Sequence, residues 1–81
     1  MPKHCSTIFV KGLPYSSNEN EIADIFKGCG EVKEVRMVTN WKSREFKGFA
    51  YIEFVESLGV VKALKMNGMV YQERRLKIVS V

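Results

Sequence analysis

The sequence predicts a two-layer α+β fold, in which two helices cover one face of a four-stranded antiparallel sheet. Two observations lead to this prediction. Along the 81 residues, alternating and helical apolar patterns follow one another in the order strand, helix, strand, strand, helix, strand. Each helical segment carries one apolar stripe, and both stripes need the same sheet face to be buried. The opposite sheet face is therefore expected to stay open.

The first predicted strand spans residues 6–11, where inward and outward side chains alternate. Ile8 and Val10 fall on the face expected to meet the core, and Thr7, Phe9 and Lys11 fall on the other. An outward aromatic ring is unusual, because the outer side of a half-buried sheet is normally polar. Glycine and proline follow the strand and predict a loop.

The first helix is predicted to begin after Asn18, a good N-cap residue, with Glu21 as its capping-box partner three residues later. Its apolar stripe repeats at helical spacing and consists of Ile22, Ile25, Phe26 and Cys29. Gly28 and Gly30 can adopt the left-handed conformation that ends many helices. We therefore expect a helix of about three turns that stops at these glycines.

Two further strands are predicted at residues 32–39 and 47–54. In the first, the inward residues are Val35 and Met37 and the outward residues are Arg36 and Val38. In the second, the inward residues are Ala50, Ile52 and Phe54, and the outward residues are Lys47, Phe49, Tyr51 and Glu53. The second strand thus sets two more rings beside a cation on the outward face. Such a face is either covered by another layer or used for binding.

The connection between these strands, residues 40–46, is polar and basic, with Lys42 and Arg44 beside Trp41. Trp41 is interpreted first as an anchor packed on the domain, with a role in ligand contact as the alternative. Tyr15, in the loop after the first strand, is likewise expected to pack.

The second helix is predicted to be capped by Ser57 and to end at residues 67–68. Its buried side is expected to consist of Val60, Val61, Ala63, Leu64 and Met66. Gly59 in the first turn weakens the helix by up to about 1 kcal/mol relative to alanine. Residues 70–71 are expected to form a short extra ribbon. The last strand runs from 75 or 76 to 81, with Leu76, Ile78 and Ser80 inward and Lys77 and Val79 outward.

Composition and charge favour a small globular binding domain over other classes of protein. The chain is 46% hydrophobic and 27% charged, and its net charge of +4 suits a polyanionic partner. Residues 1–5 are expected to be an N-terminal extension and residues 6–81 one domain. We expect no signal peptide, because residues 1–4 lead directly into polar sequence. No membrane segment or membrane partner is expected either, because no apolar run approaches about 20 residues.

Catalytic and metal sites are not expected. The two cysteines, Cys5 and Cys29, have no metal-ligand spacing, and a reduced, intracellular protein is favoured over a disulfide. His4, the single histidine, lies near the terminus, so no Ser/His/Asp or Cys/His arrangement is available. A phosphate-binding glycine loop is also absent. The prediction is therefore a non-enzyme with no catalytic residues, no metal and no cofactor.

Residues 47–54, Lys-Gly-Phe-Ala-Tyr-Ile-Glu-Phe, resemble at every position the octamer of the RNA-recognition motif family. Residues 8–13 are similar to the hexamer that the family carries on its first strand. The resemblance covers essentially the whole chain and implies the ferredoxin-like β-α-β-β-α-β fold. Two departures are Gly12, where asparagine is frequent, and Glu73, where glycine is frequent. Residues 36–40 and 65–69 also resemble motifs of spliceosomal small-nuclear-RNP recycling factors, and residues 9–13 those of nucleolin-type proteins.

The resemblance implies that the domain binds single-stranded RNA, in RNA processing or splicing. Phe9 and Tyr51 would each stack on one base, and Phe49 would pack against sugars. Lys47 would neutralise phosphate, as would Lys11, Arg36 and Lys77. A second group of candidate RNA-binding residues comprises Trp41, Lys42, Arg44 and Val79. The family also implies a monomer in the nucleus, with other proteins or neighbouring RNA-binding domains as further partners.

Three alternatives remain open at the level of the sequence. Segments outside these residues, or a partner domain, could cover the three rings. The helical face could instead serve as a protein-interaction module, for which the acidic residues Glu19, Glu21 and Asp24 are the sequence signal. Single-stranded DNA is also compatible with stacking and phosphate contacts.

Overall fold

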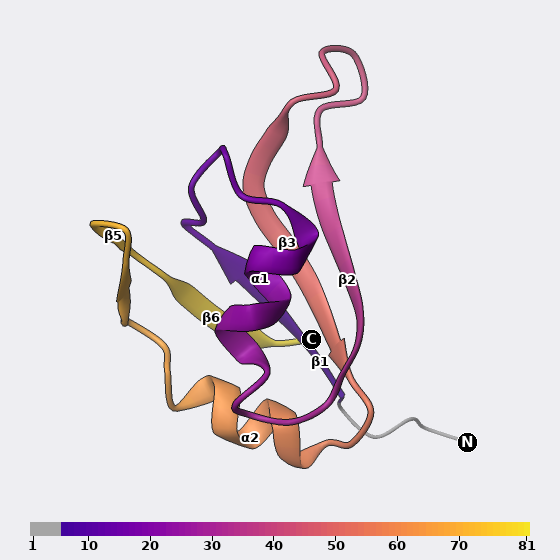
Figure 1. Ribbon diagram of the computed structural model, residues 1–81, viewed down its shortest axis with the longest axis vertical. Helices are drawn as coiled ribbons and strands as arrows, with labels where there is room; N and C mark the ends of the chain where they lie inside the picture. The colour runs from indigo at the N-terminus through magenta and orange to yellow at the C-terminus, as the bar shows by residue number, and fades with distance from the viewer. Residues whose placement is uncertain (1–5) are drawn as a thin grey trace.

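Four strands form one antiparallel sheet in the spatial order β2-β3-β1-β6, and two helices cover one of its faces (Figure 1). The strands are β1 (Thr7–Lys11), β2 (Val32–Thr39), β3 (Phe46–Phe54) and β6 (Lys77–Ser80), and the helices are α1 (Glu19–Phe26) and α2 (Leu58–Leu64). The computed structural model describes residues 6–81. The expected extension at residues 1–5, with His4 and Cys5, lies outside the described residues. The predicted two-layer α+β fold is confirmed.

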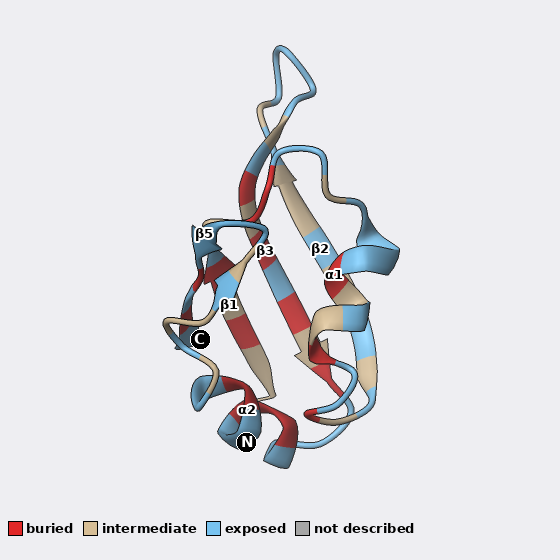
Figure 2. Ribbon diagram, turned by 60° about the vertical axis from the view of Figure 1, so that its left-hand side comes forward, coloured by how far each residue is buried: buried red, intermediate tan, exposed pale blue. Residues whose placement is uncertain are grey.

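The core lies between the helices and the sheet, and the strands contribute to it at alternating positions (Figure 2). The predicted inward residues of the two central strands are buried, as are the apolar inward residues of the last strand: Ile8, Val10, Ala50, Ile52, Phe54, Leu76 and Ile78. Val35 and Met37 on β2 are partly buried and pack against this core, as expected. Leu13 is fully buried although it lies in a loop, and its burial was not predicted from the sequence.

Helix α1 begins as the sequence predicts but ends differently. The Asn18 Oδ1 accepts a hydrogen bond from the Glu21 N–H at 2.9 Å, and the Asn18 N–H donates to Glu21 Oε1 at 3.1 Å. The predicted left-handed stop is wrong, because neither Gly28 nor Gly30 has a positive φ. Instead the Cys29 N–H donates to the Phe26 carbonyl at 2.9 Å, which tightens the end of the helix. The helix is 8 residues long, shorter than the expected three turns.

Helix α2 departs from the sequence-based expectation in its cap and in its buried face. The Ser57 side chain makes no capping hydrogen bond, because its backbone is already helical (φ −65°, ψ −20°) rather than extended. Val61 and Leu64 are exposed, by 51% and 37%, where burial was expected. The predicted burial of Val60 and Ala63 is confirmed, Met66 is partly buried, and Gly59 joins this face without having been predicted.

Gly59 explains why α2 turns this face toward the sheet. A Cβ atom at Gly59 would lie only 2.5 Å from Cγ of Phe54, so the helix backbone rests directly on that ring. Gly59 therefore occupies a core position, which the spacing of the apolar side chains in α2 does not predict.

The short extra ribbon is confirmed as β4 (Val70–Tyr71) paired with β5 (Arg74–Arg75). Gln72 and Glu73 between them both have positive φ, 51° and 67°, although neither is glycine. The last strand of the main sheet, β6, begins after Leu76 and is shorter than expected. The expectation that Ser80 is buried is wrong: it pairs with Ile8 but is exposed, because it ends an edge strand.

Candidate nucleic-acid interface

The sheet face opposite the helices carries three aromatic rings on the two central strands. The register pairs Phe9 on β1 directly with Tyr51 on β3. The centroids of these two rings are 4.9 Å apart, and that of Phe49 is 5.9 Å from that of Phe9. Tyr51 is 38% exposed, and the other two rings are half-buried against their neighbours. We call Phe9, Phe49 and Tyr51 the ring platform.

The same row of the sheet continues onto both edge strands. Val79 on β6 pairs with Phe9, and Arg36 on β2 pairs with Tyr51. Val79 is 40% exposed, and Arg36 is exposed as well. One predicted outward residue from each of the four strands therefore lies in this row of the sheet. Within residues 6–81 both helices lie on the other side of the sheet (Figure 1).

Gly48 fixes the start of β3 against the loop after β1. It has a φ of +82° and is buried, and a Cβ there would lie 2.9 Å from the Leu13 carbonyl oxygen. The Leu13 N–H donates to the Gly48 carbonyl at 3.1 Å. This close approach needs glycine, and it sets the direction of the residues on either side, Lys47 and Phe49.

Tyr15 lies at this junction with one edge of its ring near Gly48. Its Cε1 atom would be 3.3 Å from a Cβ at Gly48, and the Arg74 guanidinium lies 5.3 Å from its ring centroid. The ring is nevertheless 68% exposed. The prediction that Tyr15 packs on the domain is therefore wrong for most of the side chain, because only one edge of its ring lies near Gly48.

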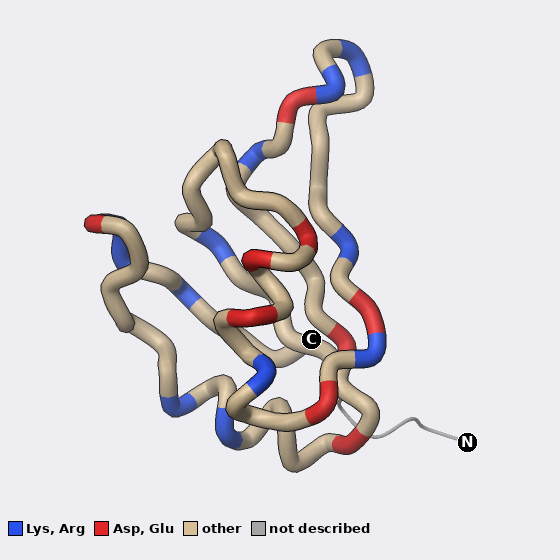
Figure 3. Tube along the Cα trace, in the orientation of Figure 1, with Lys and Arg blue, Asp and Glu red and all other residues tan. Residues whose placement is uncertain are grey.

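Three lysines surround one end of the ring platform. The Lys11 ammonium lies 5.8 Å from the centroid of Phe49, and Lys77 pairs with Lys11 across β1 and β6. Lys47 is exposed at the beginning of β3. Figure 3 shows where the Lys and Arg residues lie along the Cα trace, in blue. We call Lys11, Lys47 and Lys77 the lysine end.

The β2–β3 loop extends beyond the sheet and holds the remaining basic candidates (Figure 1). Asn40 organises it: its Oδ1 accepts from the N–H groups of Lys42 and Ser43 at 2.8 and 3.1 Å. Arg44 adopts a left-handed conformation with φ 64°. Trp41 is 79% exposed, and the Lys42 ammonium lies 5.2 Å from its ring. The interpretation of Trp41 as a packed anchor is therefore wrong, because the loop carries it away from the core.

The structure adds polar residues to this face that were not among the predicted site residues. Thr7 pairs with Glu53, and Glu34 pairs with Glu53 from the other side. These three residues form a row next to that of Phe9, Tyr51 and Arg36. Strand alternation is the signal that could have identified them as site residues. It places Thr7 on the same face as Phe9, Glu53 on the same face as Tyr51, and Glu34 on the same face as Arg36.

The described residues contain no cluster of potential metal ligands, and their one cysteine is a buried thiol. Among residues 6–81, no group of three or more His, Cys, Asp or Glu side chains could hold a metal ion. Cys29 is a free, buried thiol whose Sγ lies 3.2 Å from Sδ of Met66. Burial raises the pKa of Cys29, and nearby Lys62 partly opposes that effect, which disfavours the reactive thiolate. No helix in the described part of the chain is long and apolar enough to cross a membrane.

The fold and the exposed rings agree with the protein family that a comparison of the sequence identifies. Residues 8–77 match the RNA recognition motif family, and the chain belongs to that family. This match confirms the resemblance of residues 8–13 and 47–54 to the family's hexamer and octamer, and it covers nearly all of the described residues.

Particular relatives are much longer proteins. Mouse (Mus musculus) "spliceosome associated factor 3, U4/U6 recycling protein" is 40% identical over 72 residues, which cover 88% of this chain and 7% of that protein. Protein gar2 of Schizosaccharomyces pombe is 34% identical over 62 residues, which cover 76% of this chain and 12% of that protein. The first relative bears out the resemblance to recycling factors of the spliceosome.

Among solved structures, the chain is similar to the RNA recognition motif of Rna15 with bound RNA (GU). The TM-score is 0.81 at 27% sequence identity, with 91% of this chain and 80% of that chain covered. The similarity supports the assignment of fold and family.

Proposed function

We propose that this domain binds single-stranded RNA on the sheet face opposite the helices. The observation that carries the proposal is the ring platform, three adjacent aromatic side chains with cations around them on an otherwise open face. Membership of the RNA recognition motif family and the similarity to an RNA-bound domain support the same function. The domain acts as a binding module and not as an enzyme.

The proposed mechanism assigns different tasks to the rings and the cations. One base stacks on Phe9 and a second on Tyr51, while Phe49 packs against the sugars between them. Stacking contributes about 1–3 kcal/mol per base and tolerates any base. The lysine end neutralises phosphates, which adds affinity that depends on salt. Arg36, which pairs with Tyr51, contacts the RNA beside that ring. Trp41, Lys42, Arg44 and Val79 extend the contact beyond the platform.

The proposed cellular role is RNA processing in the nucleus, with the domain acting as a monomer. The spliceosome-associated relative supports this role. The chain spans only 7% of that relative and 12% of gar2, so the partners of a whole protein are part of the proposal too. The domain limits, 6–81, are also proposed.

A chemical-shift titration with short RNA oligonucleotides tests the proposal. Amides of β1 and β3 around the ring platform should shift, and the Phe9→Ala/Tyr51→Ala variant should weaken binding at least about tenfold, since two stacking interactions are lost. Val61→Ala removes an exposed apolar side chain from α2 and should leave binding unchanged. Unshifted platform amides at millimolar RNA would contradict the proposal.

DNA of the same sequence separates an RNA-specific domain from a general single-strand binder. Stacking and phosphate contacts are common to both nucleic acids, whereas the 2′-hydroxyl belongs to RNA alone. A several-fold preference for RNA supports the proposed function. Equal affinity for both would assign the face to single strands in general.

A second candidate function, protein interaction through the helical side, is favoured by one observation. Leu58 and Val61 on α2 are 55% and 51% exposed, and they lie three residues apart on one helix face. A protein partner on this surface would still bind the Phe9→Ala/Tyr51→Ala variant and would be lost with Leu58→Ser/Val61→Ser. The opposite pattern would place the partner on the sheet.

A further inference from the structure

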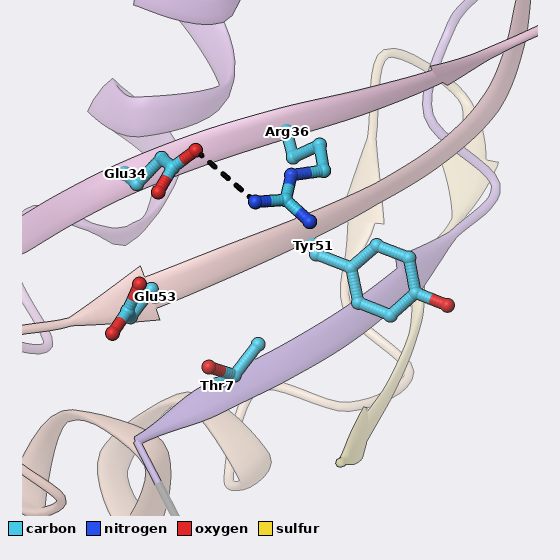
Figure 4. Close-up of a pocket in the computed structure, with 5 residues that line it drawn as sticks. All are labelled: Thr7, Glu34, Arg36, Tyr51 and Glu53. Carbon is cyan, nitrogen blue, oxygen red and sulfur yellow. Dashed lines mark hydrogen bonds and ion pairs between the residues drawn. The ribbon is translucent and has the colours of Figure 1, made fainter.

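A polar hollow lies directly beside the ring platform, at the end away from the lysines. Its volume is about 160 Å³, and it is lined by Thr7, Glu34, Arg36, Tyr51 and Glu53. Figure 4 shows these side chains rising from three neighbouring strands, with the Arg36 guanidinium between Glu34 and the Tyr51 ring. Pockets that enclose drug-sized ligands measure roughly 300–1,000 Å³. This hollow suits a smaller, flat group, such as the edge of one base.

The charges on this face are divided between its two ends. The lysine end attracts phosphates, whereas at the other end Glu34 and Glu53 are each paired with a cation, so that this end has little net charge to attract them. Because Glu34 pairs with Glu53 across β2 and β3, the two carboxylates lie in one row of the sheet. A strand of RNA on the platform is therefore oriented, with its backbone toward the lysines and base edges toward the glutamates.

The carboxylates are held only weakly and remain available to a ligand. The Arg36 Nη2 lies 3.5 Å from Glu34 Oε2, and the Lys33 ammonium lies 3.8 Å from Glu53 Oε2. These are long, partly exposed ion pairs, of a kind that contributes at most about 1 kcal/mol. A base with suitable donors can replace them at little cost.

Glu53 and Arg36 stand in different positions relative to a base on Tyr51. Glu53 follows Tyr51 by two residues on the same face, a separation of about 6.6 Å along the strand, which the edge of a stacked base and one hydrogen bond can span. Arg36 lies beside the ring on the paired strand. A carboxylate accepts two hydrogen bonds, and a guanidinium only donates.

Resting on the proposed function, we propose that the base stacked on Tyr51 is guanine, recognised by Glu53 and Arg36. The Watson–Crick edge of guanine presents two adjacent donors, N1–H and the 2-amino group, next to the O6 acceptor. Both Glu53 oxygens accept from the donors, and Arg36 donates to O6. Adenine and cytosine present one amino donor each, and the single N–H of uracil is flanked by two carbonyl oxygens that a carboxylate repels.

The test uses fluorescence anisotropy with uridine heptamers in which only the central nucleotide varies. The heptamer with central guanosine should bind at least about fivefold more tightly than those with adenosine, cytidine or uridine, the lower limit for a bidentate contact to a base. Central inosine, which lacks the 2-amino group, should lose most of this advantage. Glu53→Gln should remove the difference between guanosine and inosine, while Glu56→Gln, an exposed control beyond the end of β3, should preserve it.

The outcomes separate this inference from the function on which it rests. Equal binding of all heptamers, weakened by Phe9→Ala/Tyr51→Ala, overturns guanine recognition and leaves the RNA-binding function standing. Preference for another base, or equal effects of Glu53→Gln and Glu56→Gln, also overturns it. If no heptamer binds, both the inference and the proposed function fail.

Discussion

At the scale of single residues, Gly59 determines how closely α2 approaches the sheet. Substituting Gly59→Ala should destabilise the domain by a net amount of up to about 2 kcal/mol, because the new Cβ would lie 2.5 Å from the buried Phe54 ring and overpacking costs about 1–3 kcal/mol. Alanine is better than glycine in a helix by about 1 kcal/mol, and this gain is smaller than the steric cost. Urea denaturation followed by circular dichroism measures the change in free energy of unfolding.

Gly28 provides the matched control for this substitution. No atom lies within 4 Å of a Cβ built there, and its φ is not positive. Gly28→Ala should therefore be neutral or stabilise the domain by up to about 1 kcal/mol. If both alanine variants changed stability by the same amount, contact with Phe54 would not explain the buried glycine.

The residues that were predictable from the sequence are those whose position follows from a local period. Phe9, Phe49 and Tyr51 face outward because strand side chains alternate, and the paired strands then bring them together. Burial of Gly59 and Leu13 was not predictable, because it depends on contacts with distant parts of the chain. Trp41 was misjudged for the same reason, since local sequence does not determine the direction of a long loop.

At the scale of whole elements, the two helices begin in different ways, and this difference can be measured. Asn18→Ala removes the reciprocal capping box of α1 and should cost about 1 kcal/mol of stability. Ser57→Ala should change stability by less than about 0.5 kcal/mol, because the Ser57 side chain makes no capping hydrogen bond. Thermal and urea unfolding of the two variants provide the comparison, and an equal loss in both would contradict the assigned caps.

The same contrast shows which features of an element its sequence predicts. The capping box of α1 depends on residues three positions apart and was predicted correctly. The buried face of α2 was predicted from its apolar residues, which correctly assigned Val60 and Ala63 to the core but wrongly added Val61 and Leu64. The residue that the pattern omitted is Gly59, whose burial depends on its contact with Phe54. Apolar spacing alone does not contain that information.

At the scale of the whole molecule, the positive charge that matters for RNA is the charge located on the sheet face. Lys11→Ala and Lys65→Ala lower the net charge equally, but Lys11 borders the ring platform and Lys65 follows α2 on the other layer. Each phosphate contact that is lost should reduce the slope of log K against log salt concentration by about 0.7 for a single strand. Lys11→Ala should show this reduction. The main effect of Lys42→Ala, in the β2–β3 loop, should also be a reduced slope. Lys65→Ala should leave the slope unchanged. Anisotropy titrations of one RNA oligonucleotide at several salt concentrations measure the slopes. Equal slopes for Lys11→Ala and Lys65→Ala would show that net charge, and not its location on the sheet face, governs RNA affinity.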